Sequence, residues 1–424
     1  MNRIPPFRKA VVAFLATREA SLLEEWTESD WAKQLQWLDR SGLALPVAEK
    51  LLESENGPQI PPSILCALTK RLCDNQDRMI AMLELFDEIQ RKLKAGRIRF
   101  CCLKGFSLIT DCYSSIRERH QVDFDLLIDA NNANSAAAIL ATLDYKLISA
   151  NDSGEMRFAR PWTRHLTANS WMYDISEGPA VELHTRLWEP ETELVDFAIP
   201  EGWNESICTS AVHGLTIPRL APAWQFVHLL LHVFRHLLDS WVRLLSIYEI
   251  AVYLDREHEN YQLWQEVCTL AVSDAELASA CVLVLCMVRA AFPGQLPGPL
   301  NALCESYLSV DSAIWVRHFT EQWLFADPPG TKLTLLVQRQ FCEDSAKWRS
   351  YMLQRLLPLR APHSLSQDAS PTVKKTVRYK SDELRYKLSR LGYHLASGYG
   401  YLRSAARWRH LSQLYNKRTM QQFQ

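Results

Sequence analysis

The stretch that decides the fold is residues 97–129, which read RIRFCCLKGFSLITDCYSSIRERHQVDFDLLID. Near its end, Val122–Ile128 alternates β-branched, aromatic and acidic residues, which predicts a short strand. Because residues two apart on a strand point to the same face, Asp123 and Asp125 are expected side by side. Two adjacent carboxylates repel each other, and a raised pKa or a divalent cation between them relieves that repulsion. Carboxylate oxygens of this kind suit magnesium.

A simpler interpretation of an isolated Asp-x-Asp is a sheet edge with both acids in solvent, since two acids with one spacer arise often by chance. Here the pair follows a segment that also carries a recognisable pattern. The apolar run Phe100–Cys102 reads as a strand, Lys104-Gly105 follows it, and residues 106–113 read as a helix. A strand, a glycine turn and a helix N-terminus together favour anion binding through backbone N–H groups and the helix dipole.

Two cations accompany this predicted anion site. Lys104 lies at the turn itself, and Arg119 stands four residues before Asp123. The guanidinium of an arginine is a planar fork that matches phosphate oxygens. The stretch therefore combines a phosphate-binding segment with a pair of metal-binding carboxylates.

These residues resemble the signature of the uncharacterised nucleotidyltransferase family within the polymerase-β-like superfamily. That signature is Lys-Gly, an apolar helix, then Arg, three residues and Asp-x-Asp-Leu-Leu, followed later by an acid, one residue and His. The resemblance covers about residues 85–255, and Ala180–His184 (AVELH) supplies its later part. The wider superfamily starts its site with Gly-Ser, whereas this chain has Lys104-Gly105, with Ser107 two residues on. The positions that match the first part are Lys104, Gly105, Arg119, Asp123, Asp125, Leu126 and Leu127.

The resemblance implies an α+β fold, with a small mixed-sheet polymerase-β-like nucleotidyltransferase core flanked by helical N-terminal and C-terminal bundles. It also implies a metal-dependent enzyme, using Mg²⁺ or Mn²⁺, that moves a nucleoside monophosphate from an NTP to a hydroxyl acceptor. The acceptor is open: a small molecule, a peptide or protein, or a nucleic acid. The implied catalytic and metal-binding acids are Asp123, Asp125 and Glu182, and the implied phosphate-binding residues are Lys104, Gly105, Ser107 and Arg119.

The predicted strand Ala180–Arg186 places Glu182 and His184 on one face. Glu182 matches the third acid of the superfamily, expected to complete the metal site or to act as a general base. His184 could position a phosphate or orient Glu182. An ordinary core histidine is the simpler alternative for His184.

Three histidines, His228, His232 and His236, are spaced four apart in the predicted helix 223–238 and so share one face. In the resemblance, His232, His236 and the following Arg243 are cleft residues that contact substrate or brace the carboxylates. Zinc is the alternative, because imidazoles at i and i+4 can share it, but no HExxH glutamate lies between them.

A chain of 424 residues is too long for one core and predicts about two or three domains. We expect a helical N-terminal region, a nucleotidyltransferase α/β core, a helical domain and a basic, aromatic-rich C-terminal tail. Their predicted bounds are 1–95, 96–200, 201–357 and 358–424.

The cysteines and the apolar stretches predict a cytoplasmic protein without a transmembrane segment. The longest apolar stretch, Leu277–Phe292, is shorter than a membrane span and contains Arg289. The 11 cysteines are scattered without a CxxC pair, which favours a reducing compartment over a disulfide framework or a zinc ribbon.

The C-terminal part of the chain is strongly basic. Residues 351–424 contain 14 Lys or Arg against 3 Asp or Glu, a net charge of +11, so the rest carries −12 of the total of −1. Such a tail can bind nucleic acid, an acidic partner or an anionic membrane, or can be a solvated helical extension. Two alternatives to the enzyme therefore stay open: a non-catalytic nucleotide-binding or interaction module of the same fold, and an adaptor acting through the tail.

Overall fold

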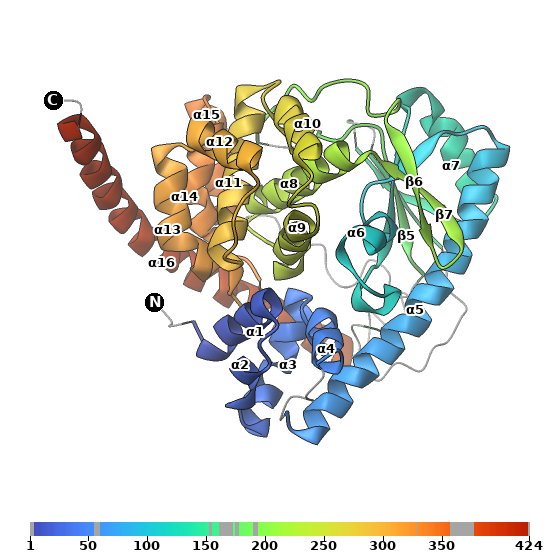
Figure 1. Cartoon of the computed structure of the whole chain (residues 1–424), viewed down its shortest axis with the longest axis horizontal. Helices are drawn as coiled ribbons and strands as arrows, with labels where there is room; N and C mark the ends of the chain where they lie inside the picture. The colour runs from blue at the N-terminus through green and yellow to red at the C-terminus, as the bar shows by residue number, and fades with distance from the viewer. Residues whose placement is uncertain are drawn as a thin grey trace.

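The computed structural model describes residues 4–54, 60–151, 155–160, 173, 178–189, 194–327, 329–356 and 377–422 (Figure 1). In this part of the chain, seven strands form one mixed sheet in the order β3-β4-β5-β2-β1-β7-β6. The central β2 pairs antiparallel with β1 and parallel with β5. The strands are β1 Phe100–Cys102, β2 Asp123–Ile128, β3 Lys146–Ala150, β4 Met156–Ala159, β5 Ala180–His184, β6 Ile207–Val212 and β7 Leu215–Leu220.

Helices precede and follow the sheet, which confirms the α+β class. The N-terminal part contains α1–α4, and α3 begins with a capping box in which Thr27 and Asp30 satisfy each other's backbone N–H groups. The predicted strand around Trp171–Ile175 lies outside the described residues except for Tyr173. The N-terminal helices are α1 Pro6–Thr17, α2 Ser21–Glu24, α3 Glu28–Ser41 and α4 Ala44–Leu52.

One long helix, α5 (Pro62–Ala95), covers one face of the sheet. The buried Phe86 of α5 lies with its ring centroid 5.5 Å from that of Phe124 and 5.6 Å from that of Phe106. Phe124 stands between Asp123 and Asp125 on β2, and strand side chains alternate between faces. Burial of Phe124 against α5 therefore directs both acids toward the opposite face.

The sheet extends beyond residue 200, where the sequence analysis expected only helices. Residues 207–220 form the hairpin β6–β7, and β7 pairs parallel with β1. The turn is His213-Gly214, with both residues at positive φ (48° and 78°), as a tight two-residue hairpin requires. The domain predicted as helical over residues 201–357 therefore begins with two strands of the sheet.

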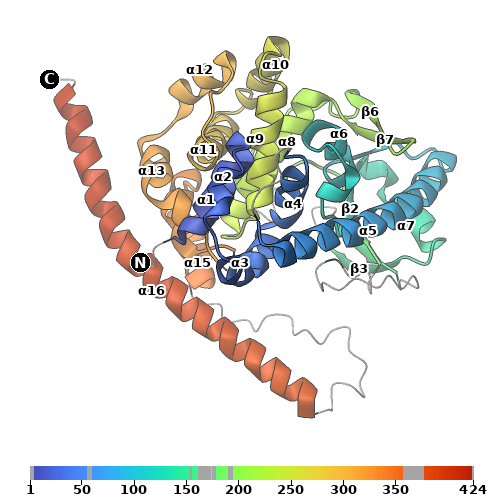
Figure 2. The ribbon, with the colours of Figure 1, turned by 60° about the horizontal axis from the view of Figure 1, so that its bottom comes forward.

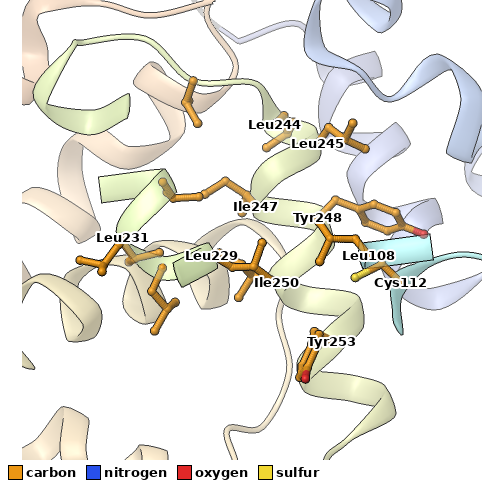
Figure 3. Close-up of a cluster of buried hydrophobic side chains, with 14 of the residues drawn as sticks. Leu108, Cys112, Leu229, Leu231, Leu244, Leu245, Ile247, Tyr248, Ile250 and Tyr253 are labelled. Carbon is orange, nitrogen blue, oxygen red and sulfur yellow. The ribbon is translucent and has the colours of Figure 1, made fainter. Parts of the chain in front are cut away.

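The C-terminal half is helical and contacts the sheet through α8 and α9. Figure 3 shows α9 packed between α8 and the segment carrying Leu108 and Cys112, with Ile247, Tyr248 and Ile250 in the buried cluster. A single helix, α16, crosses one side of the molecule and projects beyond it at both ends (Figure 2). Among the described helices, each is either too short or too polar to cross a bilayer. The helices are α8 Pro222–Leu238, α9 Leu244–Arg256, α10 Tyr261–Ala271, α11 Ala275–Ala291, α12 Gly298–Tyr307, α13 Val310–Leu324, α14 Leu335–Gln338, α15 Ser345–Leu356 and α16 Val377–Gln422.

Candidate active site

Three side chains meet where the parallel strands β2 and β5 lie side by side. The register places Asp125 directly opposite Glu182, with His184 one step along the same face of β5. One ligand atom from each of Asp125, Glu182 and His184 lies within 4.8 Å of the others. The two carboxylates at this spacing fit a divalent cation, and Asp123 stands two residues before Asp125 on the same strand.

Lys104 brings a positive charge to these acids. Its Nζ lies 3.2 Å from Oδ1 of Asp125. Gln225 at the start of α8 donates a buried hydrogen bond of 2.8 Å to the carbonyl of Leu103, so the helix fixes the chain beside Lys104. Burial lowers the pKa of Lys104, but the negative charges of Asp125, Asp123 and Glu182 outweigh it and raise the pKa. Lys104 is therefore charged.

The three acids differ in their titration because their surroundings differ. Burial and the neighbouring Asp125 raise the pKa of Asp123. Burial, Asp125 and Asp123 raise the pKa of Glu182 to about 7. Burial also disfavours the Asp125 anion, but Lys104 and His184 lower the pKa of Asp125 below its ordinary value. Asp125 is therefore ionised more readily than Asp123 and Glu182, and carboxylates that share a site in this way suit a divalent cation.

His184 joins the acids to a second carboxylate behind them. Its Nε2 lies 3.3 Å from Oδ1 of Asp125, and its Nδ1 lies 3.6 Å from Oε1 of Glu189. Burial lowers the pKa of His184, but hydrogen bonding to Asp125 and Glu189 raises the pKa to about 9. His184 is thus held between the carboxylates of Asp125 and Glu189, and its role stays a prediction.

Two residues of the site were not predicted from the sequence. Arg157 on β4 lies with Nη1 3.5 Å from Oε1 of Glu182. Glu189, which holds His184, accepts a hydrogen bond of 3.1 Å from Nδ2 of Asn151. Neither residue belongs to a recognisable motif, since their places depend on how β4 and the segment after β5 fold beside the site.

Gly105 is required by the backbone of the turn after β1. Its φ is +69°, and a Cβ at this position would lie 2.6 Å from the side-chain atoms of Gln121. The helix predicted for residues 106–113 is instead a 3-10 turn, Gly105–Leu108, followed by the short helix α6, Ile109–Cys112. The long helix expected to offer its dipole to phosphate is therefore absent from this described segment.

Ser107 and Arg119, both predicted to bind phosphate, are buried. The Oγ of Ser107 has no hydrogen-bond partner among the described residues. Arg119 donates from Nε to Oε1 of Glu249 on α9 at 2.8 Å, and the hydroxyl of Tyr113 donates to the same oxygen at 2.6 Å. Arg119 therefore joins the segment before β2 to α9, and the phosphate-binding roles of both residues stay predictions.

Arg243, predicted to line the cleft, is the residue before α9. Its guanidinium forms no hydrogen bond or ion pair within the part of the chain that the structure describes, and it lies over the ring of Trp241, 5.7 Å from the ring centroid. Burial lowers the pKa of Arg243, while Asp123 raises it. A half-buried guanidinium near Asp123, with no anionic partner among the described residues, is suited to accept a phosphate.

The three histidines of α8 face the same region. Burial and the charge of Lys104 lower the pKa of His228 and of His236 to about 3 each, and lower the pKa of His232 as well. Nε2 of His232 lies 3.1 Å from Nε2 of His236. Neither belongs to the groups of three metal-ligand residues found among the described residues, so nothing in this part of the chain supports the zinc alternative. These lowered pKa values leave the three histidines uncharged near the positive charge of Lys104.

Carboxylates and cations gathered on adjacent strands are typical of proteins that handle phosphate groups with a divalent ion. Residues 27–293 match the profile of the family described as "Uncharacterised nucleotidyltransferase", and the chain belongs to this family. The match covers the sheet, α5 and the helices that carry Arg243 and the histidines.

Comparison with solved structures finds similarity to an antigenic nucleotidyltransferase-like protein from Paracoccidioides brasiliensis. The two share 15% sequence identity, and the likeness covers 49% of this chain and 93% of that chain with a TM-score of 0.28. Among curated protein sequences, none matches this chain significantly.

Proposed function

We propose that the protein is a metal-dependent nucleotidyltransferase that moves a nucleoside monophosphate from an NTP to an acceptor hydroxyl. The observation that carries this proposal is the register of β2 and β5, which sets Asp125 opposite Glu182 with Lys104 3.2 Å from Asp125. The closeness of the Asp125 and Glu182 carboxylates supports a cation site, and the family supports nucleotidyl transfer as the reaction class.

Asp123, Asp125 and Glu182 would hold the ion, which we expect to be Mg²⁺ or Mn²⁺ because most of the donors are carboxylate oxygens. A bound divalent ion would neutralise the triphosphate and stabilise charge on the reacting phosphoryl oxygens. The role of His184 is to orient Asp125, since its other nitrogen is held by Glu189.

We expect Lys104 and Arg243 to bind different phosphate groups of the triphosphate. Lys104 lies beside the acids, and Arg243 offers a guanidinium without an anionic partner among the described residues. In the transfer, the acceptor oxygen attacks the α-phosphorus, its proton passes to Glu182, and the bond from the α-phosphorus to the bridging oxygen breaks to release pyrophosphate.

The first test is calorimetric binding of each ribonucleoside triphosphate with Mg²⁺, Mn²⁺ or EDTA. We expect metal-dependent binding by the wild type and its loss in Asp123→Asn/Asp125→Asn. A matched control, Asp77→Asn/Asp87→Asn, removes two acids of α5 and should bind as the wild type does. Equal binding by both double variants would contradict the assignment of the site.

A second test examines the role of Arg243. Arg243→Gln should weaken triphosphate binding by at least about tenfold, because a charge-assisted contact to phosphate contributes roughly 1.5–3 kcal/mol. Its unfolding free energy should stay close to that of the wild type. If Arg243→Gln binds normally, the phosphates are held by other groups, and the pose proposed here is wrong.

Turnover is measured by release of pyrophosphate from the triphosphate that binds, in the presence of candidate hydroxyl acceptors. Glu182→Gln should bind the triphosphate but lose pyrophosphate release. Metal-dependent binding without turnover for every acceptor class would favour a non-catalytic nucleotide-binding module of the same fold.

A further inference from the structure

The helix α16 carries an exposed aliphatic stripe that the proposed function does not use. Six large side chains at 36% exposure or more recur at the spacing i, i+4, i+7, i+11, i+15, i+18, so they lie along one face for about five turns. Their exposed fractions run from 55% to 70%. The members of this leucine stripe are Leu384, Leu388, Leu391, Leu395, Tyr399 and Leu402.

The opposite face of α16 is already occupied. Tyr401, Ala405 and Trp408 pack against the hydrophobic core, and the ring of Trp408 lies 6.0 Å from that of Phe319 on α13. Lys332 donates to the carbonyl of His394 at 3.3 Å. The helix is therefore attached to the body by one face, along one side of the molecule (Figure 2), and the side chains of the leucine stripe are exposed.

Basic side chains border the leucine stripe. At 100° per residue, the exposed Arg385 and Arg403 lie on one side of it and the exposed Lys387 on the other. Long cationic side chains at the edge of an apolar face can extend to headgroup phosphates while the apolar residues enter the acyl boundary. We propose that the leucine stripe docks the protein on an anionic lipid surface, with α16 lying in the plane of the interface.

Charge and chemistry favour this partner over two others. In a pair of α16 helices from two copies, the stripes would meet with basic residues on both flanks, and like charges at those positions oppose association. Single-stranded nucleic acid is bound by aromatic platforms, whereas the described stripe has five leucines and one tyrosine. Transfer of a leucine side chain from water to the hydrocarbon of a membrane is favourable, because it removes apolar surface from water.

The test is co-sedimentation of the full chain with phosphatidylcholine vesicles, with and without phosphatidylglycerol. We expect binding that requires phosphatidylglycerol and weakens with added salt. Leu391→Gln/Leu395→Gln should bind at least about tenfold more weakly, because two apolar side chains no longer enter the interface. Both leucines are exposed, so this variant should keep the wild-type thermal unfolding midpoint.

The matched control is Leu147→Gln/Ile148→Gln, which removes two exposed aliphatic side chains from β3 and should bind vesicles as the wild type does. The proposal is overturned if no vesicle binds, or if both double variants bind equally. Light scattering that finds a dimer lost only in Leu391→Gln/Leu395→Gln would assign the stripe to a second copy. Stripe-dependent binding of an RNA oligonucleotide in place of vesicles would assign it to nucleic acid.

Discussion

Gly105 allows the tight turn after β1 that places Lys104 beside Asp125. Gly105→Ala forces an L-residue to φ +69° and places its Cβ 2.6 Å from Gln121. We expect a loss of unfolding free energy of about 1–2 kcal/mol from the backbone conformation alone, with the contact adding to it. Urea unfolding and triphosphate binding measure both effects.

The control for this change is Gly214→Ala, since Gly214 also has positive φ (+78°) but has no atom within 4 Å of the added Cβ. Gly214→Ala should therefore show the backbone penalty without the contact and leave triphosphate binding intact. Equal destabilisation by the two variants would mean that Gln121 moves aside at no energetic expense.

Arg119 and Glu249 form a buried pair whose energetic role is testable by a double-mutant cycle. Arg119→Gln leaves the Glu249 carboxylate buried, with Tyr113 as its one remaining hydrogen-bond donor among the described side chains. We expect a loss of unfolding free energy of about 3 kcal/mol. Arg119→Gln/Glu249→Gln should recover much of this loss, because no unpaired charge remains. Additive losses in the double variant would mean that Arg119 and Glu249 are not energetically coupled.

At the scale of elements, the buried histidines of α8 make stability depend on pH. His228 ordinarily titrates near 6.5, but burial and Lys104 lower its pKa in the folded protein to about 3. Below pH 6.5 the unfolded chain binds a proton at this position that the folded chain does not. Stability is therefore fully present above pH 6.5 and falls, by about 1.4 kcal/mol per pH unit for this residue, as the pH drops toward 3.

The variant His228→Gln removes this proton, so its unfolding free energy should fall less steeply than that of the wild type between pH 6 and pH 4.5. Urea unfolding at a series of pH values gives both slopes. His410→Gln, at an exposed position of α16, is the control and should run parallel to the wild type. If His228→Gln also runs parallel, His228 is solvated before unfolding.

The sequence predicted the elements that carry a strong period and missed those that do not. The alternation in Val122–Ile128 and Ala180–Arg186 identified β2 and β5. The spacing of apolar residues in 63–73 and 75–93 predicts two helices, which the structure joins into α5. These pieces join because only Asp74 separates them and it does not interrupt a helix. The hairpin β6–β7 was missed because its alternation is weak, although His213-Gly214 followed by β-branched residues is a turn signal.

At the scale of the whole molecule, the acids were predictable because a spaced motif marks them, whereas their partners were not. Arg119 and Glu249 are 130 positions apart, and the segments of Lys104 and Gln225 meet through the hydrogen bond from Gln225 to the carbonyl of Leu103. Such pairs follow from the topology of the sheet and not from any local pattern. The stripe on α16 lay in a tail whose charge was visible, but which face of the helix was covered depended on the contact with α13.

The parallel pairing of β2 with β5 has a consequence for the order of folding. Asp125 and Glu182 lie on strands separated by residues 129–179, so a long loop must close before they meet, while α5 and the hairpin β6–β7 form from local contacts. On dilution from urea, pulse-labelling hydrogen exchange should find the amides of α5 protected before those of β5. Simultaneous protection would mean that sheet and helices form in one step. Sequential protection would mean that an early refolding intermediate contains helices but has not yet formed the proposed nucleotide site.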